Sequence, residues 1–188
     1  MLTRRDLLGA GVLLVSAGCL GEGTDTGNGD RGTGPSFSSP AFTGGTSIPP
    51  KYTCDGEDVS PPLRLRGTPG TESLAVVVDD PDAPTDDPFV HWLLWNVPPD
   101  IEDIPEAIAP EPTVEALDGA VQGTNDFGDL GYRGPCPPAD DEKHTYQFTV
   151  QLVDTILDLD PGTASETFRT TVEPHVRGEA TITGTYER

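Results

Sequence analysis

The chain has 188 residues and a formal net charge of −21 at pH 7, with 32 acidic residues against 11 basic ones. Such an acidic surface repels nucleic acid and anionic headgroups, which argues against a nucleic-acid partner or a polybasic contact with a membrane. Only Lys51 and Lys143 are lysines, and this lysine-poor, acidic balance is typical of halophilic proteins, which stay hydrated in high salt.

The first residues have the pattern of an export signal. A twin-arginine pair, Arg4 and Arg5, precedes an apolar stretch over residues 7–18 that is too short to span a bilayer. This stretch ends on Ser-Ala-Gly-Cys19, which resembles the lipobox of prokaryotic lipoproteins. We therefore predict a twin-arginine lipoprotein signal peptide over 1–18, with lipidated Cys19 as the anchor to the outer face of the cell membrane. A plain cleaved signal and an uncleaved anchor are the alternatives.

Residues 19–36 are Gly, Thr, Asp, Asn and little else, so we expect them to form a flexible tether. Random-coil scaling gives this tether a reach of roughly 20 to 25 Å. The remaining residues, 37–188, suit one domain that can bury a core of its own.

Two cysteines remain if Cys19 carries a lipid. A twin-arginine route exports folded chains into a compartment where thiols can stay oxidised, which predicts a disulfide between Cys54 and Cys136. Two free buried thiols are the alternative. A zinc site is not expected, because neither cysteine belongs to a C-x-x-C pair.

Two continuous apolar runs, residues 74–78 and 90–97, predict central strands that are covered on both faces. Strict alternation in the second run gives two faces with the following side chains: His91, Leu93, Trp95 and Val97 on one, and Val90, Trp92 and Leu94 on the other. Residues 146–153 alternate between apolar and polar and predict a half-solvated strand.

The last strand is predicted over the Thr-rich residues 179–186, and a weaker one over 63–65. One helix is predicted, with a capping box at 163–166, an apolar face formed by Phe168 and Val172, and Pro174 at its end. With 20 prolines and 22 glycines in the connections, the class is mainly β with one or two short helices. The loops over 98–112 and 118–138 are long enough to build a site.

Polar side chains gather at the ends of three of these strands. Asp80 ends the first, His91 begins the second, and His144 and Tyr146 begin the third. If the strands are neighbours, these four groups meet at one rim, where an imidazolium and a phenol can receive a small anion, with Asp82 in the wall. Taken singly, each residue also has a structural interpretation, as a turn cap or a satisfied core histidine.

Four motifs resemble the phosphatidylethanolamine-binding protein family, in its prokaryotic, Raf-kinase-inhibitor-like branch. They are Asp-Pro-Asp-Ala-Pro at 80–84, His-Trp-Leu-Leu-Trp-Asn-Val-Pro at 91–98, Gly-Tyr-Arg-Gly-Pro-Cys-Pro-Pro at 131–138 and His-Thr-Tyr-Gln-Phe at 144–148. The resemblance extends from about Phe37 to the end of the chain. Thr145 departs from it, because the family usually has Arg between this His and Tyr.

The resemblance implies an antiparallel Greek-key β-sandwich with a shallow pocket for phosphate, acetate or a phosphorylated headgroup. It implies no cofactor and no metal. The site residues that it indicates are Asp80, Asp82, His91 and Tyr146 on or beside the pocket floor, and Gly134, Pro137 and His144 on the flanking loop.

We therefore expect a surface-tethered protein that binds a small anion, rather than an enzyme, with contact to the membrane only through its lipid. An inhibitor or partner of an extracytoplasmic enzyme, such as a serine protease or a kinase-like protein, is the first alternative. A metal-dependent hydrolase that uses the Asp and His groups is the second.

Overall fold

The computed structural model describes residues 35–68, 70–139 and 141–188. The expected signal peptide, Cys19 and most of the expected tether lie outside the described residues. Ser36, at the end of the expected tether, already belongs to the first strand, β1 (Ser36–Ser38). Within the described ranges, no helix has the length and apolar character needed to cross a membrane.

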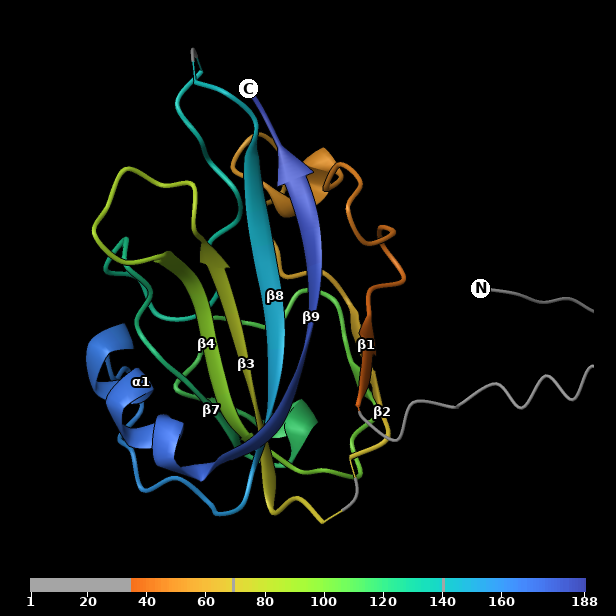
Figure 1. Cartoon of the computed structure of the whole chain (residues 1–188), viewed down its shortest axis with the longest axis vertical. Helices are drawn as coiled ribbons and strands as arrows, with labels where there is room; N and C mark the ends of the chain where they lie inside the picture. Colours follow the sequence, from red (N-terminus) through yellow and green to blue (C-terminus); the bar gives the residue numbers. More distant parts are fainter. Residues whose placement is uncertain (1–34, 69, 140) are drawn as a thin grey trace, which may run out of the picture. The chain divides into compact units, whose positions relative to one another are not determined.

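Two antiparallel sheets make up the described domain (Figure 1). The larger has the order β6-β7-β4-β3-β8-β9 and consists of β3 (Ser73–Asp80), β4 (Phe89–Val97), β6 (Thr113–Val114), β7 (Ala120–Gln122), β8 (His144–Val153) and β9 (Val176–Tyr186). The smaller has the order β1-β2-β5 and consists of β1, β2 (Leu63–Arg66) and β5 (Asp103–Ile104).

The larger sheet has Greek-key connections. Strands β3, β4 and β7 are antiparallel neighbours in chain order, and β8 returns after a long connection to pair with the free side of β3. One apolar cluster joins the inner faces of both sheets, and its members include Phe37, Leu63, Leu65, Ile104, Leu74, Val76, Val78, Trp92 and Leu94. The prediction of a mainly β, antiparallel sandwich is thus confirmed.

Strand β3 is apolar throughout because both of its faces are covered. Val76 and Val78 face the cluster between the sheets, whereas Ala75 and Val77 face a second cluster. The second cluster includes Phe168 of α1 (Ser165–Val172), which lies on the side of the larger sheet away from β1 and β2 (Figure 1). The continuous apolar run therefore had the predicted cause.

Strand β4 departs from the strict alternation expected of it, because its pairing with β3 shifts register twice. The shift near Asn96, whose φ is +56°, turns Val97 toward the cluster between the sheets. The shift at the other end leaves Val90 in the cluster with α1 and leaves His91 without a partner on β3. The faces assigned to Val90, His91 and Val97 by alternation were wrong for this reason, and His91 packs against Tyr146 instead of sharing the face of Leu93 and Trp95.

The helix begins without the predicted capping box. Its N-cap is Ala164, one residue after Thr163, and alanine has no side-chain oxygen that could accept a helix N–H; the Thr163 hydroxyl donates to the Asp160 carbonyl at 2.6 Å. The α-helix ends at Val172, and Pro174 lies in the short 3-10 turn Glu173–His175 that follows. Two further 3-10 turns cover Pro50–Tyr52 and Glu115–Leu117.

Cys54 and Cys136 form a disulfide, which joins the segment before β2 to the loop before β8. The two cysteines are 82 residues apart in the sequence. Closing a loop of that length contributes about 4 kcal/mol to the free energy of unfolding on the chain-entropy model.

Candidate functional site

A cavity of about 240 Å³ opens where β3 ends and where β4 and β8 begin. Because β3 pairs antiparallel with both β4 and β8, its last residues lie beside the first residues of those two strands, at one end of the larger sheet. The cavity is lined by Asp80, Ala83, Pro84, Thr85, Phe89, His91, Phe127, Cys136, Pro137, Pro138, His144 and Tyr146.

Asp80 is the buried carboxylate of the site. It shares the inner face of β3 with Val78, and its Oδ2 lies 2.7 Å from Nδ1 of His144. Asp79, one residue earlier, faces the other side of the sheet and pairs with Arg169 of α1 at 3.2 Å. Successive side chains of a strand point to opposite faces of the sheet, so only Asp80, and not Asp79, reaches the cavity.

His144 is the histidine of the site that pairs with a carboxylate. Burial lowers its pKa, but the hydrogen bond to Asp80 and the negative charge of that carboxylate outweigh this effect, so the pKa is raised from its ordinary value. Asp141 adds to the increase, with its Oδ2 at 3.6 Å from Nε2 of His144. Of the two histidines in the cavity, His144 is therefore the one whose surroundings favour the protonated form.

His91 lies opposite in the cavity wall and is held neutral. Its Nδ1–H donates to the carbonyl oxygen of Arg133 at 2.8 Å, which leaves Nε2 unprotonated in the neutral ring. The side chain is 2% exposed, and this burial lowers its pKa. The ring packs edge-on against Tyr146, with their centroids 5.2 Å apart.

Tyr146 brings a hydroxyl that lacks a partner. Its side chain is fully buried, and among the described residues its hydroxyl has no hydrogen bond of acceptable distance and angle. Burial, together with the nearby charge of Asp80, raises its pKa, so the phenol keeps its proton. A buried hydroxyl without a partner is costly, and it can donate to a ligand in the cavity.

Two of the expected site residues do not line the cavity. Asp82 accepts the backbone N–H of Thr145 at 2.7 Å and donates its own N–H to Asp80, so it fastens the β3–β4 loop to β8. Gly134 packs where a Cβ would lie 2.3 Å from the carbonyl oxygen of Tyr52. Asp82 is exposed and Gly134 is buried, and neither lines the cavity, whereas Pro137 contributes to its wall directly.

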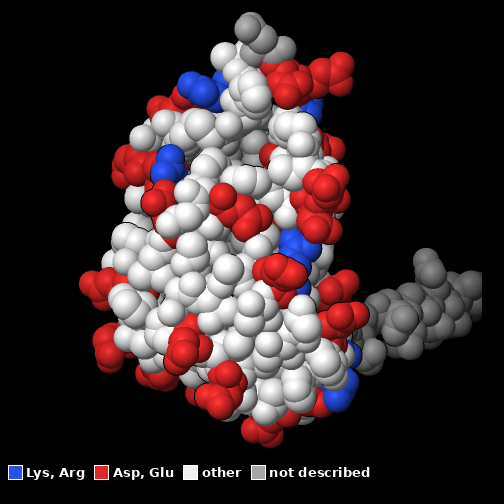
Figure 2. Space-filling model, turned by 90° about the vertical axis from the view of Figure 1, so that its left-hand side faces the viewer, with Lys and Arg blue, Asp and Glu red and all other residues white. Residues whose placement is uncertain are grey.

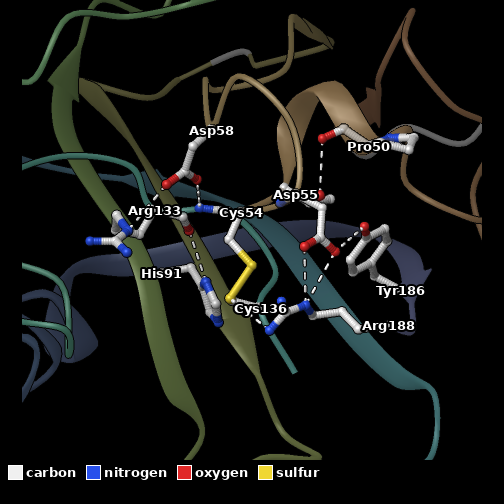
Figure 3. The surroundings of a disulfide bond; sticks show 11 residues. Pro50, Cys54, Asp55, Asp58, His91, Arg133, Cys136, Tyr186 and Arg188 are labelled. Atoms are coloured by element: carbon white, nitrogen blue, oxygen red, sulfur yellow. Dashed lines mark hydrogen bonds and ion pairs between the residues drawn. A yellow bond between two sulfur atoms is a disulfide. The ribbon is translucent and has the colours of Figure 1, made fainter. Parts of the chain in front are cut away.

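The loop that carries the Arg133 carbonyl is fastened by Asp58, a residue that the sequence analysis missed. Asp58 accepts the Gly134 N–H at 2.7 Å and pairs with Nε of Arg133 at 3.2 Å (Figure 3). Its φ of +58° marks a tight turn. Asp58 lies outside every motif considered, and only the turn-forming neighbourhood of Gly56 gave a local signal.

The sequence analysis also missed Phe127, an aromatic residue at the mouth of the cavity. Phe127 is 41% exposed at the mouth of the cavity, and its ring lies 5.3 Å from that of His91 and 4.8 Å from that of Phe89. It is held in a tight turn in which the side chain of Asn125 accepts the N–H of Phe127. An aromatic residue between Asn125 and Gly128, inside a long loop, was the signal available in the sequence.

The surroundings of the cavity are acidic. Figure 2 shows one face of the domain, over which Asp and Glu are widely scattered while Lys and Arg are sparse. An anion would therefore have to be held by short-range donors inside the cavity, because the surface does not attract it. Within the described residues, no group of three or more His, Cys, Asp and Glu side chains is placed to hold a metal ion.

Comparison with known proteins identifies relatives of the whole described domain. A family model described as phosphatidylethanolamine-binding protein matches residues 38–187. A UPF0098 protein of Pyrococcus abyssi is 42% identical over 177 residues, which cover 94% of each chain. A UPF0098 protein of Methanothermobacter thermautotrophicus is 48% identical over 150 residues, which cover 79% of this chain and 95% of the relative.

Two solved structures are similar in fold and sequence. One is described as a putative phosphatidylethanolamine-binding protein homolog from Chlamydia trachomatis, with a TM-score of 0.74, 34% identity and coverage of 83% of this chain and 99% of that one. The other is an Escherichia coli protein described as a new member of the mammalian family of the same name. It gives a TM-score of 0.77, 33% identity and coverage of 82% and 98%.

Proposed function

The chain belongs to the phosphatidylethanolamine-binding protein family, and we propose that it binds a small anion in the cavity between β3, β4 and β8. The anion is a phosphate, a phosphorylated headgroup or a carboxylate such as acetate. His144 supplies the positive charge, Tyr146 donates a hydrogen bond, and His91 supplies a second donor when it takes up a proton with the ligand.

The observation that carries this proposal is the unpaired hydroxyl of Tyr146. Buried polar groups in folded proteins are almost always hydrogen-bonded, and the Tyr146 hydroxyl lies in the wall of a cavity, where a ligand can supply the missing partner. The Asp80–His144 pair supports the same proposal, because it places a histidine with a raised pKa in the cavity wall.

Calorimetric titration of the full-length chain with inorganic phosphate tests the proposal. We expect saturable binding that weakens at least tenfold in Asp80→Ala and in His91→Ala, because each change removes a partner of the bound anion or of its donor. The matched control is His175→Ala, because His175 pairs with Asp154 at 2.8 Å and does not line the cavity. Unchanged affinity in both cavity variants would reject the site.

We also propose that the protein works at the outer face of the cell membrane, held there by lipidated Cys19. The twin-arginine pair, the lipobox-like residues before Cys19 and the Gly/Thr/Asp-rich segment that follows support this location. Cys19→Ser should release the protein from the membrane fraction. Mass spectrometry of the N-terminal peptide would contradict the proposal if it found an unmodified Cys19 within an intact leader.

A further inference from the structure

The disulfide is part of the cavity wall. Cys136 lines the cavity beside Pro137, and its partner Cys54 belongs to the segment that also contains Asp58. Both cysteines are partly exposed. Figure 3 shows the disulfide next to His91 and between two polar clusters, one at Asp58 and one at Asp55.

The same loop fixes the donor groups of the site. The Arg133 carbonyl, three residues before Cys136, holds Nδ1–H of His91 at 2.8 Å. The carbonyl of Pro135, two residues after Arg133, accepts the Cys54 N–H at 3.1 Å. The covalent link between Cys54 and Cys136 therefore acts on a loop that both orients His91 and closes one side of the cavity.

Arg188 makes one of the two sulfurs the better leaving group. Its Nη1 lies 3.8 Å from Sγ of Cys136, and its Nε is held by Asp55 at 3.1 and 3.2 Å (Figure 3). A cation at that position stabilises a thiolate, and a stabilised thiolate leaves faster in thiol–disulfide exchange. The favoured attack is therefore on Cys54, with release of Cys136.

We propose that the Cys54–Cys136 bond is a thiol–disulfide switch of the anion pocket: the oxidised form binds anions, and the reduced form binds them more weakly. This inference rests on the proposed function. Coupling between two sites is reciprocal, so a bound anion must oppose reduction by the same factor by which reduction weakens anion binding.

The chemical step uses a dithiol as the reductant. One thiolate of the dithiol attacks Sγ of Cys54, the bond to Cys136 breaks, and the Cys136 thiolate leaves toward the Arg188 guanidinium. The second thiol of the reductant then attacks the mixed disulfide and releases Cys54. Two electrons have passed to the protein, which gains two thiols, and the reductant ends as a disulfide.

The test measures both directions of the coupling on the full-length chain. Phosphate affinity is determined by calorimetry for the oxidised and the dithiol-reduced protein, with thiols counted chemically and folding checked by circular dichroism. We expect reduction to weaken phosphate binding about tenfold, and saturating phosphate to shift the reduction equilibrium by the same factor. Equal affinity of the two forms, or unfolding of the reduced chain, would overturn the switch.

Failure of the proposed function looks different, because the oxidised protein itself would then bind no phosphate. Arg188→Gln provides a second test that leaves the cavity lining intact: it should slow reduction by the dithiol several-fold while the oxidised protein keeps its phosphate affinity. An unchanged reduction rate would remove the role assigned to Arg188. The double variant C54S/C136S should bind phosphate as the reduced protein does and ignore the reductant.

Discussion

Replacing Tyr146 by Phe should change stability and binding in opposite directions. The buried hydroxyl has no hydrogen-bond partner among the described residues, so its removal relieves a desolvation cost of about 1 kcal/mol or more and should stabilise the fold. The same hydroxyl would donate to a charged ligand, and such a bond contributes about 1.5 to 3 kcal/mol, or roughly 10- to 150-fold in affinity.

Urea unfolding and calorimetric titration with phosphate measure these two effects on the same variant. Tyr132→Phe is the matched control, because Tyr132 is also buried but donates its hydroxyl hydrogen bond to the Tyr52 carbonyl at 2.8 Å. The control should lose about 1 kcal/mol of stability and bind phosphate nearly as before. A Tyr146→Phe protein that is less stable, or that binds phosphate with unchanged affinity, would refute the role given to this hydroxyl.

Three further outcomes follow from the geometry. Because Asp80 raises the pKa of His144, this pair stabilises the fold below the unfolded-state pKa of about 6.5 and less as the pH rises through the folded-state value; Asp80→Asn should flatten that dependence in unfolding experiments. Burial lowers the pKa of His91, so phosphate binding should take up more protons in the wild-type protein than in His91→Ala; calorimetry in buffers of different ionisation enthalpy that found equal proton uptake in the two would contradict this. Gly134→Ala should cost about 1 to 3 kcal/mol of stability in urea unfolding, since its Cβ would clash with backbone, whereas Gly44→Ala has free space and should be nearly neutral.

The central strands could be predicted from the sequence because burial on one or both faces determines their pattern. Residues 74–78 and 146–153 lie within β3 and β8; β3 begins one residue earlier and ends two residues later than predicted, and β8 begins two residues earlier. The two-residue strands β5 and β6 could not be found in this way, because a strand of that length has no periodicity. Tertiary packing, rather than the local sequence, determines which strands β5 and β6 pair with.

Local pattern also failed where register changes inside a strand. Val90, His91 and Val97 were assigned to the wrong faces because a strand pattern contains no sign of an inserted residue. The shift that leaves His91 unpaired arises from the pairing of β4 with β3. The predicted cap at Thr163 failed because the helix begins one residue later than the pattern indicates, with Ala164 as its N-cap.

The convergence of Asp80, His91, His144 and Tyr146 could be expected. Each lies at or near a strand end, and the end of one strand lies beside the start of its antiparallel neighbour. The two residues that support the site from other parts of the chain could not be predicted. Asp58 and Phe127 reach the site from turns that are distant in the sequence, and their contacts depend on how the 52–58 segment and the 125–129 turn pack.

One measurement tests the anion-binding claim most directly: a phosphate titration followed through the imidazole resonances of the chain's 3 histidines by nuclear magnetic resonance. The account predicts that the signals of His91 and His144 shift together with one saturation curve, while those of His175 stay in place. Phosphate that moves all three signals alike without saturation, or moves none, would contradict it.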